Sequence, residues 1–267
     1  MAREQVTSRQ ALRFGYNPVT GWLMELNDRT KAALDEVRKQ FDEDDWKHGF
    51  TGNRGVTTEA RRMLEERGVA GERLTGRIVA AYYAESQDEV RKLTYPYVRV
   101  KLVDGAEGYL VSFGLHTGPA RMLIQKLLAV KPGQVVTLAA FGKLNDEGYA
   151  NHAASLKDEA GEEIKGPGGL FKAAEAVAQE KIAALKAQGM DDRELIARAR
   201  AQAYLEFHRQ LLEDSVMPAF KAYADNARAE AGPAQDPPPE LEAATAKDGY
   251  AYGGDGGFDE MPDDVPF

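Results

Sequence analysis

Aromatic and basic residues alternate with apolar ones in one short stretch of the chain. Tyr97, Arg99 and Lys101 occupy every second position, and Tyr95 precedes them at the same spacing. Val98, Val100 and Leu102 occupy the alternate positions. Because successive side chains of a β-strand point to opposite faces, this spacing predicts one apolar core face and one aromatic, cationic face. A ring followed by cations can stack on bases and neutralise phosphates of a single nucleic-acid strand. The alternative interpretation is a solvated strand face whose tyrosines cover the end of a barrel.

Further residues of the same types lie on stretches that read as neighbouring strands. They offer rings for stacking and cations for phosphate contacts, and they are Arg77, Tyr82 or Tyr83 (of which Tyr83 is chosen), Phe113, Phe141 and Lys143. For Phe113 and Phe141, a position in the core is an equally good interpretation. Trp22 and Trp46 also have stacking surfaces, but their setting in an N-terminal helical segment favours core positions.

The elements that would position these side chains follow a recognisable order. Five stretches rich in Val, Tyr, Phe and Ala, bounded by Gly, Pro, Asp and Asn, predict strands at residues 76–85, 95–103, 109–115, 134–141 and 149–157. One helical stretch, residues 119–130, lies between the third and fourth strands. Three strands, one helix and two strands is the order of the OB-fold, a five-stranded Greek-key barrel that commonly binds oligonucleotides. We therefore predict a mainly β fold with added helices.

The segments on either side of this barrel have different compositions. Residues 1–73 read as mixed and mostly helical, with a helix capped by Asn27 or Asp28 and a second one ending at Gly68. The barrel takes residues 74–166. Residues 167–231 are Ala-rich and helical, with a break at Gly189 and a kink or end at Pro218. An apolar stripe there either packs on the body or drives self-association.

Residues 232–267 form the fourth segment, whose Pro, Gly and Asp content predicts disorder. The 267-residue chain has a net charge of −9, but the stretch 236–267 holds nine Asp or Glu and one Lys. The rest of the chain therefore carries only −1. Because phosphate binding needs a local basic face rather than a basic total, the acidic average does not exclude a nucleic-acid binder.

The chain ends on a distinctive acidic and apolar tip: Asp263, Asp264, Val265, Pro266 and Phe267. This ending resembles the C-terminal tip of bacterial and phage single-stranded DNA-binding proteins, the SSB family. The resemblance implies that these five residues dock into basic pockets with apolar floors on replication, recombination or repair proteins. It also implies single-stranded DNA binding without strong sequence preference, and a tail that competes with DNA for the basic groove.

The length, the N-terminal segment and the helical region differ from the ordinary bacterial member of that family. These differences indicate a phage or mobile-element version, and the bacterial tetramer is not carried over. Two alternatives stay open. One is an interaction protein that occupies host SSB-docking pockets without binding DNA; the other is a strand-annealing recombination mediator.

Several kinds of chemistry have no support in the sequence. There is no cysteine, and the four histidines are scattered without metal-ligand spacing. No phosphate-binding loop or nucleophile motif is present, so we expect no cofactor, no metal and no catalysis. No apolar run approaches the roughly 18 residues of a membrane span, and the charged start is not a signal peptide. We expect a cytoplasmic protein, in a bacterial host cytosol if phage-encoded.

Overall fold

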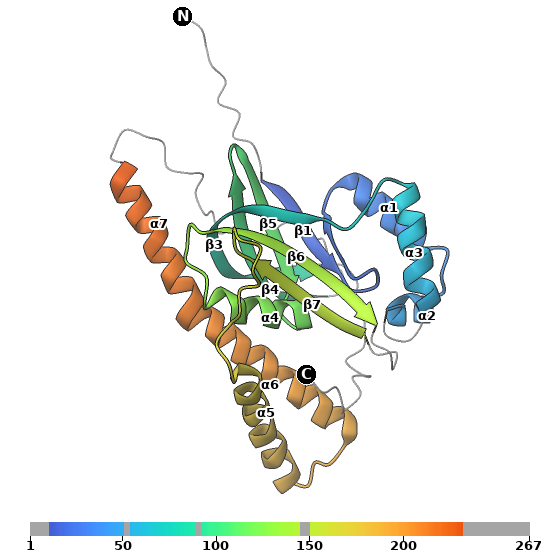
Figure 1. Cartoon of the computed structure of the whole chain (residues 1–267). Helices are drawn as coiled ribbons and strands as arrows, with labels where there is room; N and C mark the ends of the chain where they lie inside the picture. Colours follow the sequence, from blue (N-terminus) through green and yellow to red (C-terminus); the bar gives the residue numbers. More distant parts are fainter. Residues whose placement is uncertain (1–10, 51–53, 89–91, 145–149, 232–267) are drawn as a thin grey trace, which may run out of the picture.

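A single mixed sheet of seven strands, with α-helices around it, organises the computed structural model, which describes residues 11–50, 54–88, 92–144 and 150–231 (Figure 1). The strands follow one another in the order β2-β1-β5-β4-β3-β6-β7, and one further pair, Trp22 with Phe141, joins β2 to β6. The sheet therefore curls back on itself. The strands are β1 (Leu12–Asn17), β2 (Trp22–Glu25), β3 (Arg73–Asp88), β4 (Leu93–Asp104), β5 (Glu107–Gly114), β6 (Val135–Leu144) and β7 (Ala150–Lys157).

The five predicted strands and the predicted helix between them are confirmed as β3 to β7 and α4 (Gly118–Leu127). Thr117 caps α4 by accepting a hydrogen bond from the Ala120 amide, 3.3 Å away, and Pro119 occupies the first turn. The turn residues work as expected, since Gly105 and Gly133 both have the positive φ that a residue with a side chain avoids. Local sequence signals are thus sufficient for this part of the sheet.

β1 and β2 were not predicted, and they change the boundaries of the sheet. They form a hairpin in which Asn17 opposes Trp22, and β1 pairs in parallel with β5, a strand about ninety residues further along the chain. The sheet therefore crosses the predicted boundary between residues 73 and 74. The expectation of a mostly helical segment at residues 1–73 is wrong for this hairpin.

The main core lies on one side of the sheet, which we call the inner face. It contains Val98, Val100 and Leu102 of β4, none of which is exposed to solvent. The apolar side of α4 closes this core, and so do residues from the C-terminal helices, among them Leu212 and Phe220. The opposite side of the strands is the outer face.

A second, smaller cluster of apolar side chains is built by the N-terminal helices α1 (Asp28–Arg38), α2 (Glu43–His48) and α3 (Arg54–Glu66). Asn27 caps α1, as predicted, by accepting a hydrogen bond from the Thr30 amide at 2.8 Å. Trp46 is buried in this cluster, and Met24 of β2 joins it. Since Met24 is on the outer face, the helices cover the outer face at β2.

The C-terminal helices are α5 (Leu170–Ala187), α6 (Arg193–Leu211) and α7 (Met217–Ala231), with a π-helical turn (Leu212–Val216) between the last two. Asp192 caps α6 by accepting from the Leu195 amide at 2.9 Å, and Gly189 ends the preceding turn with a φ of 77°. The α-helical pattern is interrupted just before Pro218, which lacks an amide hydrogen. Figure 1 shows α6 and α7 as one long helical run below the sheet.

The predicted apolar stripe of this region packs inside the molecule at its C-terminal end. Leu212 is fully buried in the main core and Leu211 packs against it. The predicted disordered tail, including the docking tip from Asp263 to Phe267, lies outside the described residues. Of the helices in the part of the chain that the structure describes, none is long and apolar enough to cross a membrane.

Candidate nucleic-acid interface

The alternation predicted for β4 is confirmed by its burial. Tyr95, Tyr97, Arg99 and Lys101 are each partly exposed on the outer face, whereas the residues between Tyr97 and Val103 that point inward are buried. Consecutive residues on one face lie about 6–7 Å apart along the strand. The strand therefore presents two rings followed by two cations in one straight row, which we call the β4 row.

The residues beside the β4 row are mostly small. On β3, Ala84 is the partner of Tyr97 and Ser86 is the partner of Tyr95. On β5, Ser112 lies opposite Arg99 and Gly114 opposite Tyr97. Paired Cβ atoms on neighbouring strands are about 4.5–5.5 Å apart, so large partners would shield the rings. Small partners therefore flank the two tyrosines on β3 and Arg99 on β5, whereas the ring of His116 fills the space beside Gly114 and Tyr82 is the β3 partner of Arg99.

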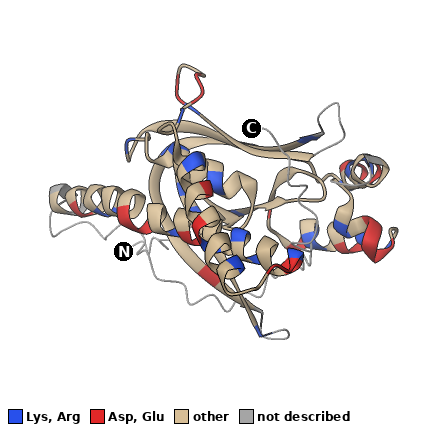
Figure 2. Cartoon of the chain, turned by 90° about the horizontal axis from the view of Figure 1, so that it is seen from below, with Lys and Arg blue, Asp and Glu red and all other residues tan. Residues whose placement is uncertain are grey.

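The outer face of the sheet is rich in cations. Its strand positions, identified from the register, carry Arg13, Arg73, Arg77, Arg99, Lys101, Lys143 and Lys157. Among the strand positions of this face whose side chains the structure describes, none carries a carboxylate. On the helices, by contrast, Lys or Arg and Asp or Glu are interspersed (Figure 2). The chain thus separates charge by sign on the sheet, although its total charge is negative.

The electrostatic surroundings keep the ring of Tyr97 neutral. Burial raises the pKa of the Tyr97 hydroxyl, and the nearby Arg99 guanidinium partly offsets this effect. Tyr95 also acts on it, which agrees with the three side chains lying on one face. A neutral phenol is the form that stacks on a base without repelling the phosphates.

Phe113 is not part of this surface. Its ring is fully buried in the main core and stacks at 6.2 Å between centroids with Tyr16 of β1. Since Phe113 pairs with Val98, it points to the inner face. The prediction that Phe113 contacts a base is therefore wrong, and the core interpretation is confirmed.

Tyr83 also points to the inner face, because a β-bulge at Val79 shifts the register of β3. Before the bulge Arg77 opposes Val103 on the outer face; after it, Tyr83 opposes the buried Val98. The Arg209 guanidinium of α6 lies 4.2 Å from the centre of the Tyr83 ring. The placement of Tyr83 beside the β4 row is wrong, and Tyr82, the partner of Arg99, takes that position.

Phe141 and Lys143 are exposed on the outer face of β6, with 46% of Phe141 open to solvent, so the core interpretation of Phe141 is wrong. They are two strands away from β4, so they do not extend the β4 row directly. Arg77 connects the two areas, because it pairs with Val103 of β4 and with Val135 of β6. Arg13 was not among the predicted residues, because it comes to this face through the unpredicted parallel pairing of β1 with β5.

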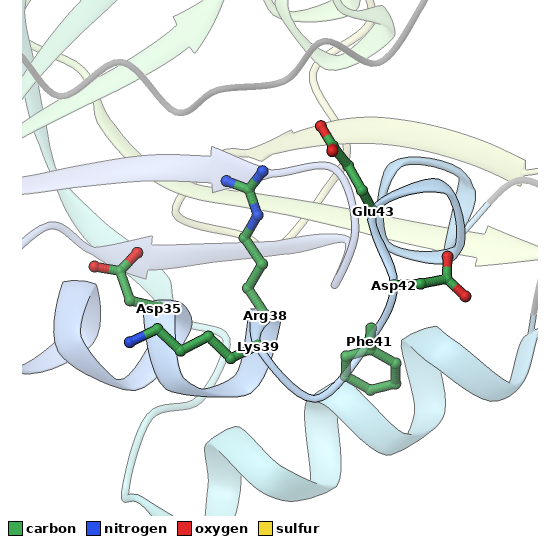
Figure 3. A pocket seen from close by; sticks show the side chains of 6 residues that line it. All are labelled: Asp35, Arg38, Lys39, Phe41, Asp42 and Glu43. Carbon is green, nitrogen blue, oxygen red and sulfur yellow. The ribbon is translucent and has the colours of Figure 1, made fainter.

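The hollow in the surface of the N-terminal helices does not offer a better site. It has a volume of about 390 Å³ and is lined by Asp35, Arg38, Lys39, Phe41, Asp42 and Glu43 (Figure 3). Cations and carboxylates are mixed in it, and Asp42 is engaged in capping α2 through the Asp45 amide at 2.8 Å. Within the described ranges, no group of three or more His, Asp or Glu side chains is arranged to hold a metal ion.

Comparison of the chain with protein-family models, with curated proteins and with solved structures gave no match. The case for a function therefore depends on the outer face itself.

Proposed function

We propose that the chain binds single-stranded DNA without strong sequence preference on the outer face of β3, β4 and β5. The observation that carries the proposal is the β4 row, in which two partly exposed tyrosines precede Arg99 and Lys101. The β3 partners of its two tyrosines are small, and the described strand positions around it supply cations. This is the combination that sequence-tolerant single-strand binding requires: ring faces for any base and a cationic path for the backbone.

In this proposal each side chain has one task. Bases stack on Tyr97 and Tyr95, with Tyr82 beside them, and each stacked base contributes about 1–3 kcal/mol. Arg99 and Lys101 contact phosphates, with Arg77 continuing the path on β3. Phosphate contacts carry no sequence information, so the site discriminates little between bases.

Two further features support placing the chain with the SSB family. Along the chain, β3, β4, β5, α4, β6 and β7 follow one another in the order of elements of an OB-fold. We propose that architecture for the sheet and α4. The C-terminal tip from Asp263 to Phe267 resembles the partner-docking tip of that family. We propose that it recruits replication, recombination or repair proteins while the outer face holds DNA.

The test is binding of a fluorescent oligo-dT to the full chain across a salt series, compared with two single variants. We expect Tyr97→Ala to weaken binding roughly 5- to 150-fold, which corresponds to one lost base stack. We expect Arg99→Gln to weaken binding as well. It should also reduce the magnitude of the slope of log K against log salt by about 1, the amount for one lost phosphate contact. The control is Lys172→Gln, an exposed lysine of α5 away from the outer face, which should leave affinity unchanged.

Truncation before Asp259 adds a second arm to this experiment. Removing a competing polyanion should leave DNA affinity equal or higher. If neither the full nor the truncated chain binds oligo-dT at low salt, the proposal fails. The chain would then be better explained as an interaction protein that uses its tip alone.

A further inference from the structure

A second pair of aromatic side chains lies on the outer face, away from the β4 row. Trp22 of β2 and Phe141 of β6 are direct partners in the pairing that joins these two strands. Side chains of directly opposed residues lie on the same face with Cβ atoms about 4.5–5.5 Å apart. Phe141 is 46% exposed and Trp22 is partly exposed. The two rings therefore form a partly open aromatic surface.

Arg61 of α3 holds Trp22 in place. Its guanidinium lies 5.4 Å from the centre of the Trp22 ring and donates a hydrogen bond from Nε to the Thr20 carbonyl oxygen at 2.6 Å. The backbone of the hairpin is also tied to β6, because the Gly142 amide donates to the Gly21 carbonyl at 3.0 Å. A ring held by such contacts loses little conformational entropy when a ligand stacks beside it.

A polar path runs from the β4 row to these two rings. Arg77 and Arg73 are exposed on the outer face of β3, four residues and therefore about 13 Å apart. Between them, the hydroxyl groups of Thr75 and Thr137 are hydrogen-bonded at 2.9 Å on the same exposed surface. Arg73 opposes Ala139, which is two residues before Phe141 on β6. Lys143 follows Phe141 at the same spacing.

We propose that a long single strand occupies two contact areas: the β4 row, and a second area made of Trp22, Phe141 and Lys143. Its phosphates pass over Arg77 and Arg73 between them, and a base stacks on Phe141 beside Trp22. This inference rests on the proposed function. It adds Trp22 as a ligand-contacting residue, and it makes affinity depend on the length of the strand.

Strand length separates the two areas experimentally. Tyr97 of β4 pairs with Ala84 of β3, and Ala139 of β6 pairs with Arg73 of β3. These two positions on β3 are eleven residues apart, which is about 36 Å. An oligo-dT of about 5 nucleotides is too short to stack on Tyr97 and Phe141 together, whereas one of about 16 nucleotides, near the upper site size of an OB-fold, can.

The experiment measures the binding of both oligomers to the full chain and to Phe141→Ala. We expect Phe141→Ala to weaken binding of the long oligomer roughly 5- to 150-fold, as for one lost base stack, and to leave the affinity for the short oligomer unchanged. Tyr97→Ala should weaken both. Leu195→Ala, which truncates a side chain of α6 that is 37% exposed, is the matched apolar control and should change neither.

Tryptophan fluorescence provides an independent readout. Trp46 is only 8% exposed within the helical cluster, so a bound base reaches Trp22 alone. The long oligomer should quench the emission, and this quenching should disappear in Trp22→Phe. The inference is overturned if Phe141→Ala binds the long oligomer as well as the unchanged chain does, while Tyr97→Ala binds it weakly. If neither oligomer binds the unchanged chain, the proposed function itself has failed.

Discussion

Replacing Arg61 of α3 should lower the stability of the fold, because its side chain joins three separate elements. The side chain is half-buried between two rings, at 5.4 Å from the centre of Trp22 and 5.7 Å from that of Phe50. It also donates hydrogen bonds to the carbonyl oxygens of Thr20 and Gly142, at 2.6 and 3.4 Å. Arg61 thus joins α3, the hairpin of β1 and β2, and the end of β6.

The size of the loss can be worked out from these contacts. A hydrogen bond from a charged group contributes about 1.5–3 kcal/mol, and the 2.6 Å bond to Thr20 is the one with good geometry. The bond to Gly142 is long and contributes little. Contacts of a guanidinium with rings add about 0.5–2 kcal/mol. Since Arg61→Met keeps most of the apolar volume, we expect it to lower the free energy of unfolding by about 2–5 kcal/mol.

Urea denaturation followed by far-ultraviolet circular dichroism measures this loss. The matched control is the neighbouring residue, because Arg62 has the same side chain on the exposed side of α3 and pairs there with Glu59 and Glu66. Exposed pairs of this kind contribute little, so Arg62→Met should leave the midpoint nearly unchanged. Equal midpoints for Arg61→Met and Arg62→Met would refute the idea that Arg61 joins the three elements.

Two other predictions test the interior and the bulge. Burial lowers the pKa of His152 and His208 to about 4. Because the unfolded chain then binds protons more readily than the folded chain does, the free energy of unfolding should fall as the pH drops from about 6.5 to 4. His208→Gln should remove about 2–3 kcal/mol of the difference between the free energies of unfolding at pH 7 and pH 4.5; an unchanged difference would contradict a neutral, buried His208. Tyr82→Ala should weaken oligo-dT binding, while Tyr83→Phe should leave it unchanged, because the bulge turns Tyr82 to the outer face. If Tyr83→Phe weakens binding and Tyr82→Ala does not, this assignment of the two rings is refuted.

The strands from β3 to β7 were predictable because each carries its signal locally. From Tyr97 to Leu102 of β4 the two faces alternate between partly exposed and buried, and the turn after the strand contains Gly105. The cap of α1 was narrowed to Asn27 or Asp28 for the same reason, since a side chain that accepts an amide hydrogen bond three residues ahead needs no distant partner. Partial exposure of the β4 row follows directly from the alternation.

β1 and β2 could not be predicted in this way. β1 is six residues long with a glycine in its middle, and β2 is four residues long. Their strand conformation is stabilised by pairing with β5 and β6, and by the burial of Phe14 and Leu23 in the main core. A propensity read over a short window does not contain these contacts.

The error at Tyr83 has a different cause. Arg77 and Tyr83 are six residues apart, so a regular strand would place both on one face. The bulge at Val79 inserts one extra residue and reverses the faces of every later position in β3. The adjacent tyrosines Tyr82 and Tyr83 leave the sequence pattern compatible with either register, and the pairing with β4 decides it.

The N-terminal hairpin links the stability of the sheet to the proposed binding surface. Without β1, the edge of β5 would present unpaired amide and carbonyl groups, a site for unwanted strand pairing. By covering that edge, β1 also brings Arg13 to the position opposite Leu110 of β5, whose partner on the other side is Lys101. β2 does the same at the other end by placing Trp22 against Phe141. The contacts that complete the sheet therefore also extend its cationic and aromatic face, so a variant that loosens the hairpin should lose affinity for long strands before it unfolds.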